Sequence, residues 1–230
     1  MNGNSDDVKV NCAKVLFIDR DGTLIKEAPP TYQLDAFSKL EFYPHLFEYL
    51  TKIVTEFDYE LVMVTNQDGL GTAAFPEDCF WPIQHFILQA LQNEGIVFSE
   101  ILIDRTFAKE NKPTRKPGTG MMTAYLDADK YDLKNSFVIG DRLTDVQLAK
   151  NLGCKAFWLN NHDNLGNHEL EATAETLKDT IALETQNWKD IYGYLCAPPR
   201  TVAHVRNTNE TKIGVTINLD GQGQSIIETG

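Results

Sequence analysis

The feature that most constrains the fold is a short apolar segment that ends in two carboxylates. Val15–Ile18 is entirely apolar, and Asp19 and Asp21 follow it with one residue between them, before a Gly22-Thr23 turn. A continuous apolar run of this length is typical of a strand that is buried on both faces, as in a parallel sheet. Open α/β sheets bind their ligands beyond the carboxyl ends of the strands. We therefore expect the two carboxylates to line a ligand site.

The spacing of these two carboxylates suggests a chemistry but does not establish it. Two neighbouring carboxylates repel each other, and a bound metal cation would stabilise both as anions. One carboxylate can then attack an electrophile while the other exchanges protons. The plain alternative is a strand that ends in two solvated acidic side chains, and an Asp-x-Asp pair alone does not decide between them.

Apolar runs and helical patterns alternate along the next 140 residues. Further short apolar runs, each read as a buried strand, lie at 61–64, 101–103, 136–139 and 156–159. Between them, helical spacing predicts helices that begin at Pro44 and extend over about 78–95, 118–129 and 145–152. Two more helices are predicted at 169–184 and 187–195. This alternation predicts an α/β fold, a doubly wound parallel sheet with helices on both faces.

Two of the later predicted strands also end in polar side chains. Thr65 and Asn66 close the second strand, and Asp141 and Asp145 follow the fourth. A hydroxyl and exposed amides at a strand end can bind phosphate oxygens, although a Thr-Asn pair alone is more often a turn cap. Because parallel strands align their carboxyl ends, these groups are predicted to converge with the first carboxylates at one edge of the sheet.

A basic loop, residues 105–117, stands out in an acidic chain of net charge -12. Its cations are Lys109, Lys112, Arg115 and Lys116, besides Arg105 at its start. The loop is either simply solvated, or it supplies a cation that neutralises a phosphate beside the metal. The chain thus contains four candidate site segments in order: Asp19/Asp21, Thr65/Asn66, the basic loop and Asp141/Asp145. Together they are far more specific than any one of them, and they favour the phosphate-binding interpretation of the loop.

The four motifs resemble those of the haloacid-dehalogenase superfamily of phosphohydrolases, over about residues 14 to 160. The longer segments FIDRDGTLIKEAPP, VTNQDGLGTAAFP, RKP and VIGDRLTDVQLA resemble the histidinol-phosphate phosphatase half of bifunctional histidine-biosynthesis enzymes. The resemblance implies a Rossmann-like sheet with a minimal cap and magnesium-dependent hydrolysis of a small-molecule phosphate ester, L-histidinol phosphate, through an aspartyl-phosphate. Two alternatives stay open: a sugar-phosphate phosphatase of the heptose-bisphosphate type, and a non-catalytic module.

The resemblance also implies roles for single residues. Asp19 would be the nucleophile, and Asp21 would protonate the leaving group and then deprotonate the attacking water. Magnesium would be held by Asp19, Asp141 and the backbone carbonyl of Asp21, and Asp145 would orient the lysine or a metal-bound water. The candidate phosphate contacts are Thr65, the amide of Asn66, Lys116 and Arg115. Glu27 and Gln33 would receive the amino or imidazole end of the substrate; by composition alone, Glu27 is a solvated surface acid.

In one respect the chain departs from the pattern of these families. Close relatives often carry a cysteine- and histidine-rich zinc loop before the lysine of the third motif. Here Asp104–Pro117 contains neither cysteine nor histidine. Without thiolates or imidazoles this loop cannot form a tetrahedral zinc site, and we predict no structural zinc.

The chain changes character after residue 196. We predict a leader at 1–13, a phosphatase domain at 14–196, a linker at 197–200 and a further segment at 201–230. Alternating residues at 203–211 and 213–221 predict a β-hairpin that resembles the start of imidazoleglycerol-phosphate dehydratase. The histidine-rich metal sites of that enzyme are missing, so dehydratase activity is expected only in a longer bifunctional chain. The unpaired edges of a lone hairpin favour self-association.

Composition limits the partners and the compartment. A net charge of -12 argues against nucleic acid and against non-specific membrane attachment. The four cysteines, Cys12, Cys79, Cys154 and Cys196, form no Cys-x-x-Cys pair and are read as reduced thiols of a cytoplasmic protein. The polar start lacks an apolar signal core, and no segment reaches transmembrane length.

Overall fold

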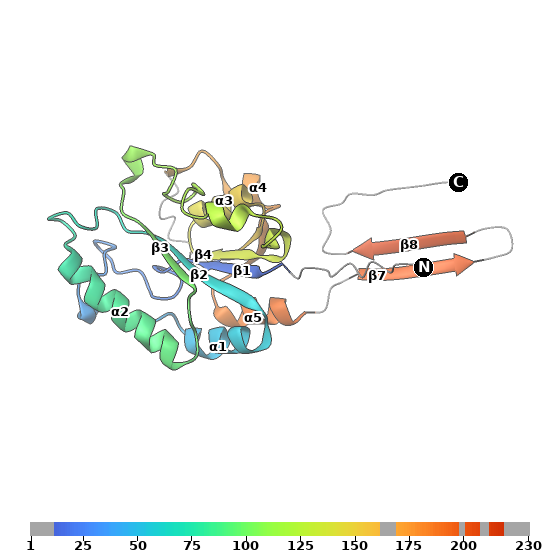
Figure 1. The fold of residues 1–230 in the computed structure, drawn as a ribbon, viewed down its shortest axis with the longest axis horizontal. Coiled ribbons are helices and arrows are strands. Elements are labelled where there is room, and N and C mark those ends of the chain that lie inside the picture. The colour runs from blue at the N-terminus through green and yellow to red at the C-terminus, as the bar shows by residue number, and fades with distance from the viewer. Residues whose placement is uncertain (1–11, 162–168, 198–200, 208–211, 219–230) are drawn as a thin grey trace, which may run out of the picture. The chain divides into compact units, whose positions relative to one another are not determined.

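A six-stranded parallel sheet forms the centre of the computed structural model, which describes residues 12–161, 169–197, 201–207 and 212–218. The strand order is β3-β2-β1-β4-β5-β6 (Figure 1). The strands are β1 (Lys14–Ile18), β2 (Tyr59–Asn66), β3 (Glu100–Asp104), β4 (Phe137–Gly140), β5 (Lys155–Leu159) and β6 (Ile181–Thr185). All five predicted strands are present, and the predicted doubly wound sheet is confirmed.

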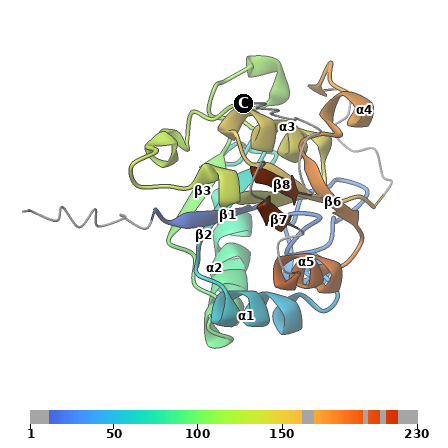
Figure 2. The same ribbon diagram turned by 90° about the vertical axis from the view of Figure 1, so that its right-hand side faces the viewer.

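Helices cover both faces of this sheet (Figures 1 and 2). One face carries α1 (Leu46–Glu56), α2 (Glu77–Asn93) and α5 (Trp188–Cys196), and the other carries α3 (Leu143–Leu152) and α4 (Ala174–Leu177). Side chains alternate along β1, so Val15 and Phe17 join the core cluster that contains Val146 and Leu152 of α3. Burial on both faces explains why β1 is apolar from Val15 to Ile18.

Two helix predictions were wrong. Residues 118–129 form only a short 3-10 helix, η3 (Thr123–Leu126). Gly118 lies so close to Pro113 that an added Cβ would be 2.2 Å from the Pro113 carbonyl oxygen, so this segment packs on the basic loop and not as a regular helix. Residues 169–184 contain the single turn α4 and then β6, which pairs with the open edge of β5. Pairing with a neighbouring strand overrode the helical pattern there.

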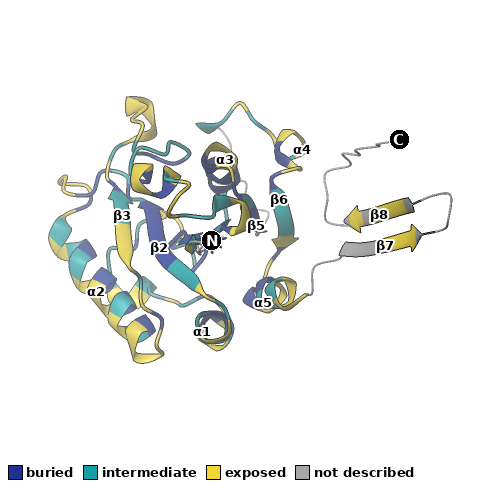
Figure 3. Cartoon of the chain, turned by 45° about the vertical axis from the view of Figure 1, so that its right-hand side comes forward, coloured by how far each residue is buried: buried dark blue, intermediate teal, exposed yellow. Residues whose placement is uncertain are grey.

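The C-terminal strands form the predicted hairpin: β7 (Thr201–Asn207) pairs antiparallel with β8 (Lys212–Asn218). The chain divides into two compact units, Met1–Tyr192 and Gly193–Gly230. Val205, Ile213, Val215 and Ile217 of the hairpin are exposed (Figure 3). The predicted leader, except for its last two residues, and most of the predicted linker lie outside the described residues. Among the described helices, none combines the length and apolarity that a bilayer-spanning segment requires.

Candidate active site

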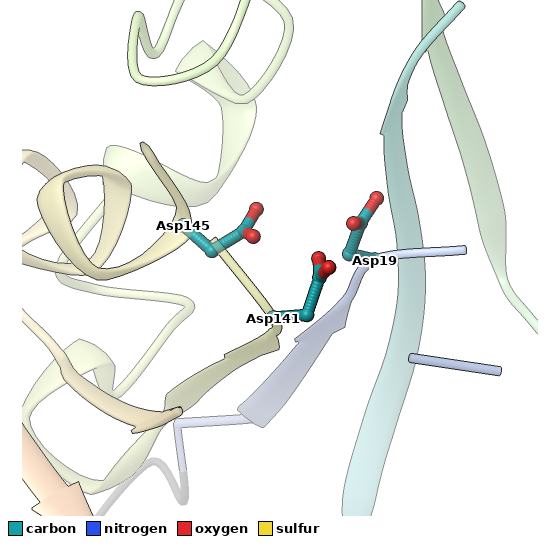
Figure 4. A group of neighbouring side chains, drawn as sticks. All are labelled: Asp19, Asp141 and Asp145. Carbon is teal, nitrogen blue, oxygen red and sulfur yellow. The ribbon is translucent and has the colours of Figure 1, made fainter. Parts of the chain in front are cut away.

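Three carboxylates meet at the carboxyl edge of the sheet. Asp19 follows β1, Asp141 follows β4, and Asp145 lies in the first turn of α3. One oxygen of each lies within 4.8 Å of the other two, and Figure 4 shows the three side chains pointing toward one space. Gly22, at a φ of +75°, makes room for them: an added Cβ would lie 2.1 Å from Asp141 Oδ2. A side chain at Gly22 would therefore displace the Asp141 carboxylate.

Lys116 bridges two of these carboxylates. Its Nζ lies 2.7 Å from Asp19 Oδ1 and 2.7 Å from Asp145 Oδ1, and its side chain is buried. Burial alone would lower the pKa of Lys116, but the charges of Asp145 and Asp19 outweigh it and raise the pKa above the ordinary value. Asn66 holds the backbone of Lys116, accepting from its N–H at 3.1 Å and donating to its carbonyl oxygen at 3.2 Å. The structure thus brings the predicted lysine and asparagine together.

One lysine cannot neutralise three carboxylates, of which two are buried and that of Asp141 is half-buried. Burial raises the pKa of Asp19 to about 7, although Lys116 acts in the opposite direction. Burial, followed by the charges of Asp19 and Asp145, raises the pKa of Asp141 well above its usual range. Asp141 Oδ1 is also buried, with no hydrogen-bond partner in the described part of the chain. A hard divalent cation fits this donor set, because all its ligand atoms are carboxylate oxygens.

The side chain of Asp21 is held apart from this group by two other residues. Arg20 donates from Nε to Asp21 Oδ2 at 3.0 Å and from Nη2 to Oδ1 at 2.9 Å. Gln67 donates from Nε2 to Asp21 Oδ2 at 2.6 Å and to Thr65 Oγ1 at 2.8 Å. Arg20 is fully buried and also binds Gln67 and Gln84. The sequence analysis assigned no role to Arg20 or Gln67. Their positions could have indicated one, because Arg20 lies between Asp19 and Asp21 and Gln67 directly follows Thr65 and Asn66.

All four predicted phosphate contacts line one cavity of about 200 Å³. The predicted site residues around it are Asp19, Asp21, Gln33, Thr65, Asn66, Arg115 and Lys116. The charge of Arg115 is already balanced, because its guanidinium binds Asp68 at 2.5 Å and Glu169 at 2.9 Å. The protonated lysine and the buried hydroxyl can donate hydrogen bonds to a tetrahedral anion, and the Asp19 carboxylate lies beside them.

Glu27 does not line this cavity. It lines a neighbouring cavity of about 370 Å³, and Tyr32 borders both cavities. Arg142 donates to Glu27 Oε1, while Glu27 Oε2 is buried without a hydrogen-bond partner in the part of the chain that the structure describes. Burial raises the pKa of Glu27, and Arg142 opposes the shift. Glu27 and Gln33, predicted to act together, therefore face two adjoining cavities.

Comparisons with known proteins place this geometry in context. A model of the HAD-hydrolase-like family matches residues 113–180. The chain is 49% identical over 220 residues to the histidine biosynthesis bifunctional protein HisB of Spirosoma linguale, and 50% identical over 217 residues to the protein of that name from Bacteroides fragilis. The matches cover 94% of this chain but only 57% and 56% of the two relatives, so the chain spans about half their length.

Solved structures resemble the fold. The heptose 1,7-bisphosphate phosphatase from B. bronchiseptica, complexed with magnesium and phosphate, matches with a TM-score of 0.64 at 20% identity, over 79% of this chain and 97% of that one. A structure described as a HAD-like phosphatase from Mesorhizobium loti matches with a TM-score of 0.61 at 21% identity, over 80% of this chain and 86% of that one. At these identities the likeness establishes the fold alone.

Proposed function

We propose that this chain, which belongs to the haloacid-dehalogenase-like hydrolases, hydrolyses a phosphomonoester through an aspartyl-phosphate. The observation that carries the proposal is the bridge from Lys116 to Asp19 and Asp145. Beside it lies a buried oxygen of Asp141 for which the described residues provide no hydrogen-bond partner. A carboxylate beside a fixed cation, at the edge of an anion-sized cavity, is suited to phosphoryl transfer, which depends mainly on positioning and charge neutralisation.

The reaction would proceed in two steps. An oxygen of Asp19 attacks phosphorus, the bond from phosphorus to the ester oxygen breaks, and Asp21 gives its proton to the departing alkoxide. Asp21 then takes a proton from water, which attacks the phosphorus of the aspartyl-phosphate and releases inorganic phosphate, so both aspartates return to their starting state. Thr65, the Asn66 amide and Lys116, with Arg115 at the cavity wall, hold the phosphoryl oxygens.

A magnesium ion would complete the charge balance. Asp19, Asp141 and the backbone carbonyl of Asp21 would hold it, and it would supply positive charge next to the phosphoryl group. Asp145, which forms an ion pair with Lys116, would orient the lysine. The absence of structural zinc from the basic loop stays a prediction.

We infer L-histidinol phosphate as the substrate. The support is the likeness to the histidine biosynthesis bifunctional proteins over nearly the whole chain. Glu27 lines a cavity that adjoins the phosphate cavity, and its Oε2 has no hydrogen-bond partner among the described residues. This oxygen offers an acceptor for the amine or imidazole of that substrate. Such a biosynthetic enzyme would act in the cytoplasm on a small molecule, without nucleic acid or membrane.

A panel of phosphate esters, with and without magnesium, tests this function. We expect magnesium-dependent release of phosphate, fastest from L-histidinol phosphate. Faster hydrolysis of a heptose bisphosphate would reject the substrate, and no hydrolysis of any ester with magnesium present would reject the phosphatase. Glu27→Gln is expected to weaken turnover of histidinol phosphate more than that of a neutral ester, and equal effects on both would exclude recognition of the cationic group by Glu27.

A further inference from the structure

The basic loop that carries Lys116 is hydrogen-bonded at its base to the carboxylate of Asp104, a residue outside the candidate site described above. Asp104 is the last residue of β3, and only 3% of it is exposed. In the sheet it pairs in register with Asn66 of β2, the residue that holds the Lys116 backbone. Asp104 and Asn66 thus stand side by side at the carboxyl edge, at the base of the loop.

Both oxygens of Asp104 are used to tie the loop. Oδ1 accepts from the backbone N–H of Thr106 at 2.8 Å and from the Thr106 hydroxyl at 2.5 Å. Oδ2 accepts from the hydroxyl of Thr114 at 2.6 Å. One carboxylate therefore joins the outgoing and the returning arms of the loop. All three donors are neutral, so these contacts are hydrogen bonds and not ion pairs. They require acceptor atoms in the right positions at residue 104.

The returning arm leads directly into the site. Thr114 precedes Arg115 and Lys116, and Arg115 Nη1 donates to the Thr106 carbonyl oxygen at 2.9 Å, which joins the two arms a second time. Between these ties, residues 107–113 are all exposed. They include one short 3-10 helix, η2 (Ala108–Glu110). The loop contributes little buried surface of its own, so its shape depends on the ties at its base.

We propose that Asp104 is a positioning residue: with Thr106 and Thr114 it forms a hydrogen-bonded clasp that fixes Lys116 against Asp19 and Asp145. The clasp works through acceptor geometry and not through net charge. It stabilises the Thr114 side of Lys116, while Asn66 stabilises the backbone of Lys116 itself. This inference rests on the proposed function only where it concerns turnover, since the position of Lys116 can be measured without any substrate.

Substitutions separate geometry from charge. In Asp104→Asn, the amide oxygen can still accept from Thr106, and the amide nitrogen can donate to Thr114, whose hydroxyl then accepts. Asp104→Ala removes all three hydrogen bonds that residue 104 accepts, and Thr114→Val removes only the one nearest Lys116. Two changes serve as matched controls: Asp132→Ala, which removes an acceptor of Asn135 in a separate loop, and Thr55→Val, which removes a hydroxyl donor of helix α1.

Two measurements on the full chain test the clasp. The first is acetylation of Lys116 by an N-hydroxysuccinimide ester, followed by peptide mass spectrometry with the exposed Lys150 as the internal reference. The second is kcat/KM for the best ester of the panel, with inhibition by inorganic phosphate.

Asp104→Ala and Thr114→Val are expected to raise the rate of Lys116 labelling about tenfold. They are also expected to lower kcat/KM about tenfold or more. Both magnitudes correspond to the loss of one buried hydrogen bond. Asp104→Asn and both controls should stay within about threefold of wild type, less than the loss of one such bond. Unchanged Lys116 labelling in Thr114→Val would overturn the proposal, and so would an Asp104→Asn variant as impaired as Asp104→Ala. If the wild type hydrolyses no ester, the proposed function fails, and the labelling rates still decide whether the clasp exists.

Discussion

At the scale of single residues, the site places more negative charge in the protein interior than its one lysine can balance. Folding moves the Asp141 carboxylate into a buried position next to Asp19 and Asp145, which raises its pKa well above 3.8. The folded protein therefore binds this proton more tightly than the unfolded chain does. Stability linked to Asp141 is complete below about pH 4 and is lost as the pH rises through the raised folded pKa.

This linkage predicts that Asp141→Asn stabilises the protein when divalent metal has been removed. At pH 7.5, with a chelator present, the variant should unfold with a free energy at least about 1 kcal/mol greater than wild type, and the gain should shrink toward pH 4. Urea denaturation at several pH values measures it. Added magnesium should stabilise wild type and not the variant. A variant less stable than wild type at every pH would contradict this picture of the site.

The contacts of Gln67 predict a second effect at this scale. Gln67→Met keeps the side-chain length but removes the donors to Asp21 and Thr65, so kcat should fall about tenfold or more, the effect of losing one or two buried hydrogen bonds. Steady-state kinetics measure it. The matched control is Gln89→Met on the exposed side of α2, which should leave kcat unchanged. Equal rates in the Gln67 variant and wild type would show that Asp21 does not depend on this contact.

At the scale of elements, α5 supports the turn that follows the first two aspartates. Trp188 is completely buried, and its Nε1 donates to the carbonyl oxygen of Thr23 at 3.1 Å. Trp188→Phe would leave that carbonyl without this donor and should lower the free energy of unfolding by about 1–3 kcal/mol. The control is Trp81→Phe, which removes the hydrogen bond from Trp81 Nε1 to the partly exposed Glu77. Because water can replace this donor, the free energy of unfolding should fall by less than about 1 kcal/mol. Urea denaturation gives both values, and equal losses would argue against the role of Trp188.

The elements also show where sequence reasoning succeeds and where it stops. The strands were predictable because an apolar run such as Val15–Ile18 can be buried only between two layers of helix. β6 was not, since Ile181–Thr185 becomes a strand by pairing with β5, a contact between distant residues. The same holds within the site: the motif residues, and Gln67 directly after one motif, were visible in the sequence. The hydrogen bonds that Gln67 and Asp104 make depend on side-chain geometry that no pattern encodes.

At the scale of the whole molecule, the hairpin belongs to a different compact unit from the sheet. We propose that residues 14–196 are the catalytic domain and that 201–230 are the start of a second domain, with 197–200 as linker. Deleting residues 198–230 should then leave kcat/KM within about twofold of the full chain, because no residue of the candidate site is removed. Enzyme assays on both chains measure this, and a large loss of activity would contradict the division.

The exposed apolar side chains and unpaired edges of the hairpin predict self-association of the full chain. Sedimentation velocity over a range of concentrations should show oligomers for the full chain and a monomer after the deletion. A monomeric full chain at high concentration would rule out this role of the hairpin.

The central claim is that Asp19 accepts the phosphoryl group covalently. Acid quench of the working enzyme, reduction with borohydride and peptide mass spectrometry would convert an aspartyl-phosphate into homoserine at the modified position. We predict homoserine at position 19, and its absence from Asp19→Asn, which should fold but lose turnover at least about a thousandfold. Steady turnover with no modification at position 19, or with modification at another residue, would contradict the account.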